Sequence, residues 1–151
     1  MLEVFNLPAH PLLVHIPVVA IPVFSIIAIV MVVRSKFRSR YAISAIILGV
    51  ITTISTFLAA SSGTALANEF PFLEEEIGTH RQLGETLRLF VLGLTVSVIG
   101  IVAAGRRADV NSKDPLSLLV GVAGIAFAVL SLIWVIRTGH AGASRNWNGF
   151  F

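Results

Sequence analysis

The chain has 151 residues, of which 56% are hydrophobic and 13% are charged, whereas soluble domains carry about 25% charged residues, so the composition is that of an integral membrane protein. The net charge is +3, but seven of the eleven Lys and Arg residues lie in two short loops between apolar runs. No basic face with interleaved aromatic residues accompanies them, which argues against nucleic-acid binding. Because the chain has no cysteine, it cannot supply a disulfide, a thiolate metal site or an iron–sulfur cluster.

Four apolar runs follow one another, and each reaches the ~20 residues that a helix needs to cross ~30 Å of hydrocarbon. They are Leu12–Val33, Tyr41–Leu66, Leu83–Ala104 and Leu116–Ile136. With their polar ends, these runs predict membrane-spanning helices over about 12–33, 41–66, 80–104 and 116–140. Short connections favour antiparallel neighbours, so the sequence predicts one all-α domain over residues 1–151, an up-down-up-down bundle of four transmembrane helices.

The charges of the three connections predict the orientation of this bundle. The first connection, RSKFRSR at 34–40, has four basic residues, and GRRADVNSKD at 105–114 has three more. The connection between the second and third spans, NEFPFLEEEIGTH, carries four glutamates. The positive-inside rule therefore places the basic connections in the cytoplasm and both chain termini outside.

The four histidines belong to three different spans. His10 and His15 come at the start of the first span, His80 at the start of the third, and His140 at the end of the fourth. At 1.5 Å per residue, His10, His80 and His140 lie roughly 36 Å above the cytoplasmic ends, and His15 lies about 28 Å above them. The sequence therefore predicts that all four imidazoles gather at the outer end of the bundle.

Local patterns predict where two of these helices begin or end. THRQ at 79–82 has the pattern of a capping box, with Thr79 as N-cap and His80 as the first helical residue. RTGHAG at 137–142 offers Gly139 or Gly142 as the glycine that ends the fourth helix.

Small residues lie close to these histidines. Gly84 comes one turn after His80 and so shares its helix face. In the second span Thr52, Thr56, Ala59 and Gly63 recur at helical spacing. Such a stripe allows close helix packing, and it would equally leave room for a flat ligand.

Two arginines lie inside the third and fourth spans. Arg88 follows Glu85 at i, i+3, the spacing of an intrahelical ion pair. Alternatively, Arg88 or Arg137 receives an anionic ligand group such as a propionate, because charges within membranes rarely lack partners.

The stretches HPLLVHIP and TGHAGASRNW resemble the two ends of an uncharacterised family of small bacterial membrane proteins. Its members begin with a His-Pro-Leu-x-x-His-hydrophobic-Pro signature and close with Gly-His-x-Gly-Ala and an aromatic residue. The matching positions here include His10, His15, His140 and Trp147. In some members the domain is joined to Rieske or cytochrome c modules. The resemblance implies a respiratory or redox setting. Together with the charges of the connections, it leads us to expect a multi-pass protein of the bacterial inner membrane with periplasmic termini.

The leading functional hypothesis is a b-type cytochrome that holds haem b between two histidines from different helices. His15, His80 and His140 are the preferred ligands, with His10 as a fourth, and Arg88 or Arg137 as propionate partners. Because these candidate ligands lie at one end only, such a protein would pass electrons laterally to a membrane or periplasmic redox partner rather than across the bilayer.

Two alternatives remain open. The histidines could instead form a Cu or Zn site, since three imidazoles are a familiar ligand set for either ion. The third hypothesis is a cofactor-free structural or assembly subunit of a larger membrane complex. A catalytic role has little support because no nucleophile and base are recognisable together.

Overall fold

In the computed structural model, the described residues are 3–4, 7–69, 74–107 and 114–147, with side chains over 10–68, 78–106 and 114–144. A short antiparallel pair, β1 (Glu3–Val4) and β2 (Leu7–Pro8), precedes the helices. The helices are α1 (Ala9–Leu13), α2 (His15–Val33), α3 (Ser35–Glu69), α4 (Glu74–Arg107) and α5 (Pro115–Trp147). The backbone hydrogen bonds Val14 N–His10 O and Val18 N–Val14 O carry α1 almost without interruption into α2.

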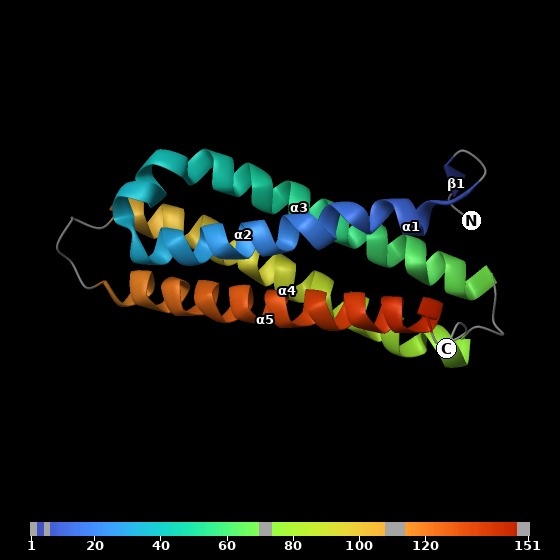
Figure 1. The fold of residues 1–151 in the computed structure, drawn as a ribbon. Helices are drawn as coiled ribbons and strands as arrows, with labels where there is room; N and C mark the ends of the chain where they lie inside the picture. The colour runs from blue at the N-terminus through green and yellow to red at the C-terminus, as the bar shows by residue number, and fades with distance from the viewer. Residues whose placement is uncertain (1–2, 5–6, 70–73, 108–113, 148–151) are drawn as a thin grey trace.

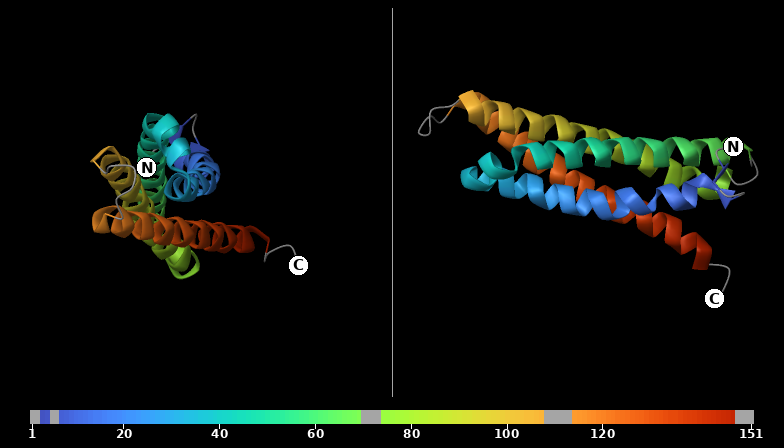
Figure 2. Two further views of the ribbon diagram at one scale, coloured as in Figure 1. Left: turned by 90° about the vertical axis from the view of Figure 1, so that its left-hand side faces the viewer. Right: turned by 90° about the horizontal axis from the view of Figure 1, so that it is seen from above.

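The four long helices form an antiparallel bundle in which α2 packs on α3, α3 on α4, α4 on α5, and α5 on α2 (Figure 1). The two further views show that α5 runs obliquely across the other long helices (Figure 2). Both chain termini lie at one end of the bundle, together with α1. We call this the histidine end, and the opposite end, which holds the α2–α3 connection, the basic end. The all-α bundle of four membrane-length helices is therefore confirmed.

The outer surface of the bundle is apolar along its length. Four helical segments are long and apolar enough to cross a membrane, and each contains an 18-residue stretch with a mean hydropathy between 2.1 and 2.9: His10–Val33, Ser35–Asn68, Gly78–Arg106 and Pro115–Ser144. Large apolar side chains such as Val19, Ile43, Leu118 and Ile136 are exposed on their outer faces. Exposed apolar surface of this extent is stable only in contact with lipid or another protein.

The first connection is shorter than predicted. Of the expected loop over residues 34–40, only Arg34 leaves the helical region, with φ −126° and ψ 95°. The following residues already belong to α3, which kinks at Tyr41 (φ −113°, ψ 15°). Long basic side chains can extend from a helix toward water, so their charge does not require an irregular backbone.

Two predicted helix boundaries were wrong. The third long helix begins at Glu74, so Thr79 and His80 lie inside α4 rather than at its cap. The backbone of residues 74–76, assigned to a loop, is therefore helical. Likewise, α5 continues through Gly139 and Gly142 to Trp147, because glycine ends a helix only where it adopts a left-handed conformation.

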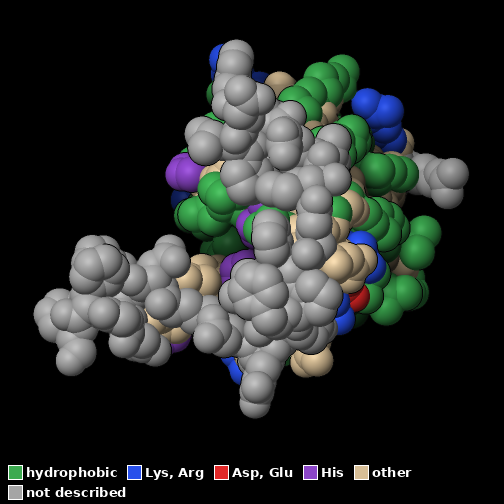
Figure 3. Space-filling model, turned by 90° about the vertical axis from the view of Figure 1, so that its right-hand side faces the viewer, with side chains coloured by type: hydrophobic (Ala, Val, Ile, Leu, Met, Phe, Trp, Pro, Cys, Tyr) green, Lys and Arg blue, Asp and Glu red, His purple; other side chains and the backbone are tan. Residues whose placement is uncertain are grey.

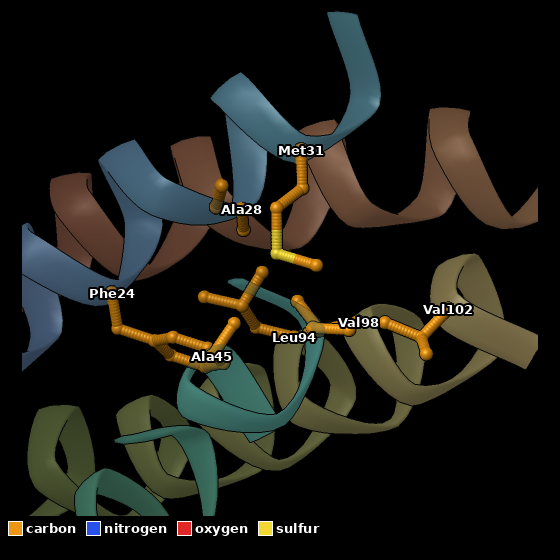
Figure 4. Packing of buried hydrophobic residues seen from close by; sticks show 9 residues of the cluster. Phe24, Ala28, Met31, Ala45, Leu94, Val98 and Val102 are labelled. Carbon is orange, nitrogen blue, oxygen red and sulfur yellow. The ribbon is translucent and has the colours of Figure 1, made fainter. Parts of the chain in front are cut away.

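In the interior of the bundle, large side chains of one helix pack against glycines of another. The main apolar cluster joins all four long helices (Figure 4) and includes Phe24, Ala28, Met31, Ala45, Leu94, Val98, Val102 and, from α5, Ala128. Phe24 is fully buried, and a Cβ added to Gly49 would lie 2.6 Å from its ring. Between α3 and α4, Thr53 and Thr95 share a hydrogen bond of 2.8 Å between their hydroxyls. The bundle therefore combines apolar packing with a polar contact between helices.

Candidate cofactor-binding site

The four histidines lie at the histidine end, as their positions in the helices require. His10 is in α1, His15 begins α2, His80 is in the first half of α4, and His140 is near the end of α5. Figure 3 looks onto this end, where histidine side chains are visible among the hydrophobic and polar ones. The shared height still leaves open which imidazoles face one another.

Two of the four imidazoles meet. The ring centroids of His10 and His80 are 6.1 Å apart, and their planes are inclined at 82°. Both side chains are half-buried. The two rings come from α1 and α4, helices that are far apart in the sequence.

Each ring of this pair is held by a backbone carbonyl of a neighbouring helix. His10 Nδ1 donates to the carbonyl oxygen of Ala59 in α3 at 2.9 Å, and His80 Nδ1 donates to that of Thr138 in α5 at 3.0 Å. Ser62 Oγ lies 3.2 Å from His10 Nδ1 and donates to the same Ala59 oxygen at 2.8 Å. Because a carbonyl oxygen can only accept, the proton of each neutral ring is on Nδ1, and Nε2 keeps its lone pair.

Glycines in the opposing helices make this approach possible. A Cβ added to Gly63 would lie 2.8 Å from His10 Cε1, and one added to Gly142 would lie 3.1 Å from His80 Cε1. Any larger residue at either position would push against an imidazole. In contrast, a Cβ added to Gly84 would meet nothing within 4 Å. There is therefore open space one turn from His80 along α4.

His15 and His140 do not join the pair. Both are exposed, although each is close in sequence to a residue that points inward. Pro17 is buried, and Gly142 faces His80. Two residues span about 200° of helical turn, so His15 and His140 point away from the interior. Among the residues that the structure describes, no group of three or more histidine, cysteine, aspartate or glutamate side chains is placed to hold a metal ion.

Below the histidines, the ion pair expected on α4 is present. Arg88 Nη2 lies 3.9 Å from Glu85 Oε2, and Thr64 Oγ1 donates to Glu85 Oε1 at 3.4 Å. The Arg88 guanidinium also lies 5.5 Å from the Phe57 ring centroid. Its buried Nε has no hydrogen-bond partner among the described residues. The Nε–H group of Arg88 is therefore a buried donor without an acceptor among the described residues, next to the Glu85–Arg88 ion pair.

The other candidate arginine is in a different setting. Arg137 is exposed, and its guanidinium lies 5.1 Å from the Trp134 ring centroid. Trp134 in turn packs edge-on against Phe90, with ring centroids 5.0 Å apart. Arg137 is thus held on an aromatic surface rather than in an ion pair with a described carboxylate.

Sequence reasoning missed the partners that orient the imidazoles. The carbonyls of Ala59 and Thr138 are backbone groups, which no residue type marks. The small-residue stripe of α3 gave a partial signal, because Ala59 and Gly63 belong to it. The ring of His10 occupies the space beside Gly63, and the other residues of the stripe, Thr52, Thr56 and Ala59, are buried.

Residues 6–149 match the model of a family described as a predicted membrane protein family, DUF2231. The chain belongs to this family. The matched range of the DUF2231 chain includes all four histidines and all four long helices up to Trp147. No curated protein and no solved structure matches the chain.

Proposed function

We propose that this protein binds one haem b between His10 and His80 and acts as an electron-transfer protein, or electron-transfer subunit, of the membrane. The observation that carries the proposal is the arrangement and hydrogen bonding of these two imidazoles. They come from different helices, their ring centroids lie 6.1 Å apart with near-perpendicular planes, and each is oriented by an Nδ1–H···O=C bond that leaves the Nε2 lone pair unprotonated. Metal-binding histidines characteristically donate their second ring nitrogen to such a partner.

The separation of the rings is compatible with a shared metal ion. An imidazole nitrogen binds a metal such as zinc at about 2.0–2.1 Å, so two imidazoles on opposite sides of one ion have centroids about 6 Å apart. The observed separation is 6.1 Å. The near-perpendicular planes are no obstacle, because each ring can rotate about its bond to the metal.

The number of ligands favours haem over a bare metal ion. A porphyrin supplies four nitrogens of its own, so two imidazoles complete the coordination of its iron. A structural zinc site needs four protein ligands and a catalytic one needs three. The described residues bring only two imidazoles together and offer no larger ligand group. When bound, haem supplies one-electron redox chemistry.

Residues near the imidazole pair could accommodate the porphyrin ring and pair with its propionates. The open space at Gly84 lies on the same helix as His80. Arg88 has a buried Nε that lacks an acceptor among the described residues, and Arg137 is exposed at the same end of the bundle. Either arginine can pair with a propionate. Because the imidazole pair lies at one end, electrons would pass laterally to a redox partner in the membrane or in the adjoining aqueous space.

The distribution of basic residues indicates on which side of the membrane the histidine end lies. The four basic residues of 34–40 lie at the opposite end of the bundle from the histidine pair. The positive-inside rule then places the basic end in the cytoplasm. We place the protein in the bacterial inner membrane with its histidine end and both termini facing the periplasm.

The test is the absorption spectrum of the protein purified from cells grown with haem available. Wild-type protein is expected to show a Soret band, and His10→Ala and His80→Ala should each abolish or strongly reduce it. His15→Ala and His140→Ala are the matched controls, because they remove exposed imidazoles at the same end. Colourless wild-type protein, or equal losses in all four variants, contradicts the proposal.

Two alternative functions would use the same pair of imidazoles, His10 and His80. Two opposed imidazoles could hold a copper ion, and metal analysis would then find stoichiometric copper, or zinc, without porphyrin absorption. The same Nδ1 bonds also join α1 to α3 and α4 to α5. A structural or assembly subunit that uses its histidines as interhelical clamps would therefore be colourless and free of metal.

A further inference from the structure

A groove of about 560 Å³ lies at the basic end, at the opposite end of the bundle from the histidine pair. It follows the junction of α2 and α3, where the backbone leaves the helical region at Arg34. Its lining residues are Val33, Arg34, Ser35, Lys36, Phe37, Arg40 and Tyr41. We call this feature the basic groove.

The basic groove has positive charge and no opposing carboxylate. Arg34, Lys36 and Arg40 are all exposed, and the lining contains neither aspartate nor glutamate. In the part of the chain that the structure describes, no carboxylate forms an ion pair with any of these three side chains. Arg40 instead lies 5.8 Å from the Tyr41 ring centroid. The chemistry of the groove therefore suits an anion.

Apolar surface continues from the groove along the membrane-spanning helices. Val33 is 67% exposed at the end of α2, and Ile43 and Ile47 are 67% and 53% exposed along α3. The aromatic rings of Phe37 and Tyr41, whose centroids are 4.6 Å apart, line the same groove as the cations. Aromatic side chains at such a level are typical of the membrane interface. A ligand that fits both parts has an anionic head and a hydrocarbon tail.

We propose that the basic groove binds the headgroup phosphate of an anionic phospholipid, whose acyl chains lie along the exposed apolar residues of α2 and α3. Basic pockets at the end of membrane-spanning helices are suited to this recognition. A free phosphate ion would use the three cations and leave the adjoining apolar surface without a partner. The proposal concerns the basic end and does not depend on cofactor binding at the other.

The experiment is native mass spectrometry of the purified, delipidated protein in detergent. The protein is incubated with phosphatidylglycerol, with phosphatidylcholine of the same acyl chains, or with inorganic phosphate. Wild-type protein is expected to retain phosphatidylglycerol at least tenfold better than phosphatidylcholine. Combining Arg34→Gln, Lys36→Gln and Arg40→Gln should weaken that retention about a hundredfold, since each cation contributes about fivefold near an anionic lipid.

The matched control combines Arg106→Gln, Arg107→Gln and Lys113→Gln, which removes the same charge from the other basic connection. This control should retain phosphatidylglycerol as the wild type does. Equal loss in both triple variants would mean that overall charge, and not the groove, holds the lipid. Unchanged retention in the groove variant, or displacement of the lipid by millimolar phosphate, also overturns the proposal. If the groove variant fails to fold, as judged by circular dichroism, Lys36→Gln alone should lower retention about fivefold.

Discussion

Replacing Gly63 with alanine tests the position of His10 without reference to any cofactor. The alanine Cβ would lie 2.8 Å from His10 Cε1, whereas ordinary contact begins at about 3.4 Å. The imidazole must therefore move by about 0.6 Å, or α1 must move with it. Such a shift strains the 2.9 Å bond between His10 Nδ1 and the Ala59 carbonyl.

Two effects of opposite sign decide the stability of this variant. Alanine in place of glycine within a helix stabilises the protein by roughly 0.5–1 kcal/mol. Losing the histidine hydrogen bond costs about 0.5–1.5 kcal/mol. The net effect of Gly63→Ala should therefore lie between a gain of about 0.5 kcal/mol and a loss of about 1 kcal/mol. Gly84→Ala adds a Cβ that meets nothing within 4 Å, so it should show the full helical gain.

The measurement is the difference in thermal unfolding temperature between Gly63→Ala and Gly84→Ala, both cofactor-free in the same detergent. A gap of about 1 kcal/mol corresponds to about 2–4 °C for a chain of this size. In the His10→Ala background the ring is absent, and the gap should close. Equal stabilisation by both glycine substitutions in the wild-type background would show that His10 does not lie against α3.

Three further predictions concern packing and topology. Thr95→Val removes the 2.8 Å bond to Thr53 and the 3.2 Å bond to the Gly49 carbonyl, and a double-mutant cycle with Thr53→Val should give a coupling of about 0.6 kcal/mol for the first bond; a cycle that shows no coupling would contradict that bond. Phe24→Ala removes a fully buried ring packed on Gly49 and should cost about 3–5 kcal/mol, measured by chemical unfolding; a loss below about 1 kcal/mol would mean that the interior can collapse around it. Alkaline phosphatase fused after the last residue should be active, and the same enzyme inserted between α4 and α5 should be inactive; the reverse pattern would invert the proposed orientation.

The number and antiparallel order of the long helices followed from the sequence because a bilayer imposes a minimum apolar length and short connections force reversal. Helix ends were harder to predict. THRQ has the composition of a cap, but the glutamates before it continue the helix back to Glu74. RTGHAG contains two glycines, but neither ends α5. In both places a local pattern was outweighed by a longer helix in which those residues form internal turns.

For the candidate site, the sequence predicted how far along the bundle each histidine lies, but it did not predict which way each imidazole points. Counting residues along each span placed the histidines at one level, because the rise per residue is fixed. Which way each imidazole points depends on how the helices are rotated against one another. His15 and His140 were preferred as ligands, yet both are exposed, and His10, ranked last, is the partner of His80. The glycines that admit these rings lie in other helices, so only the packed structure identifies the pair.

The imidazole pair occupies a junction between two halves of the bundle. His10 connects α1 to α3 through the Ala59 carbonyl, and His80 connects α4 to α5 through the Thr138 carbonyl. These bonds use Nδ1 on both rings, so a group bound at the two Nε2 atoms would leave them intact. Occupation of the site would then add a link between the α1–α3 half and the α4–α5 half without breaking those that already exist. Under the proposed function, the bundle would not need a bound cofactor in order to fold. Any stability gained on binding would then measure whether both imidazoles are engaged.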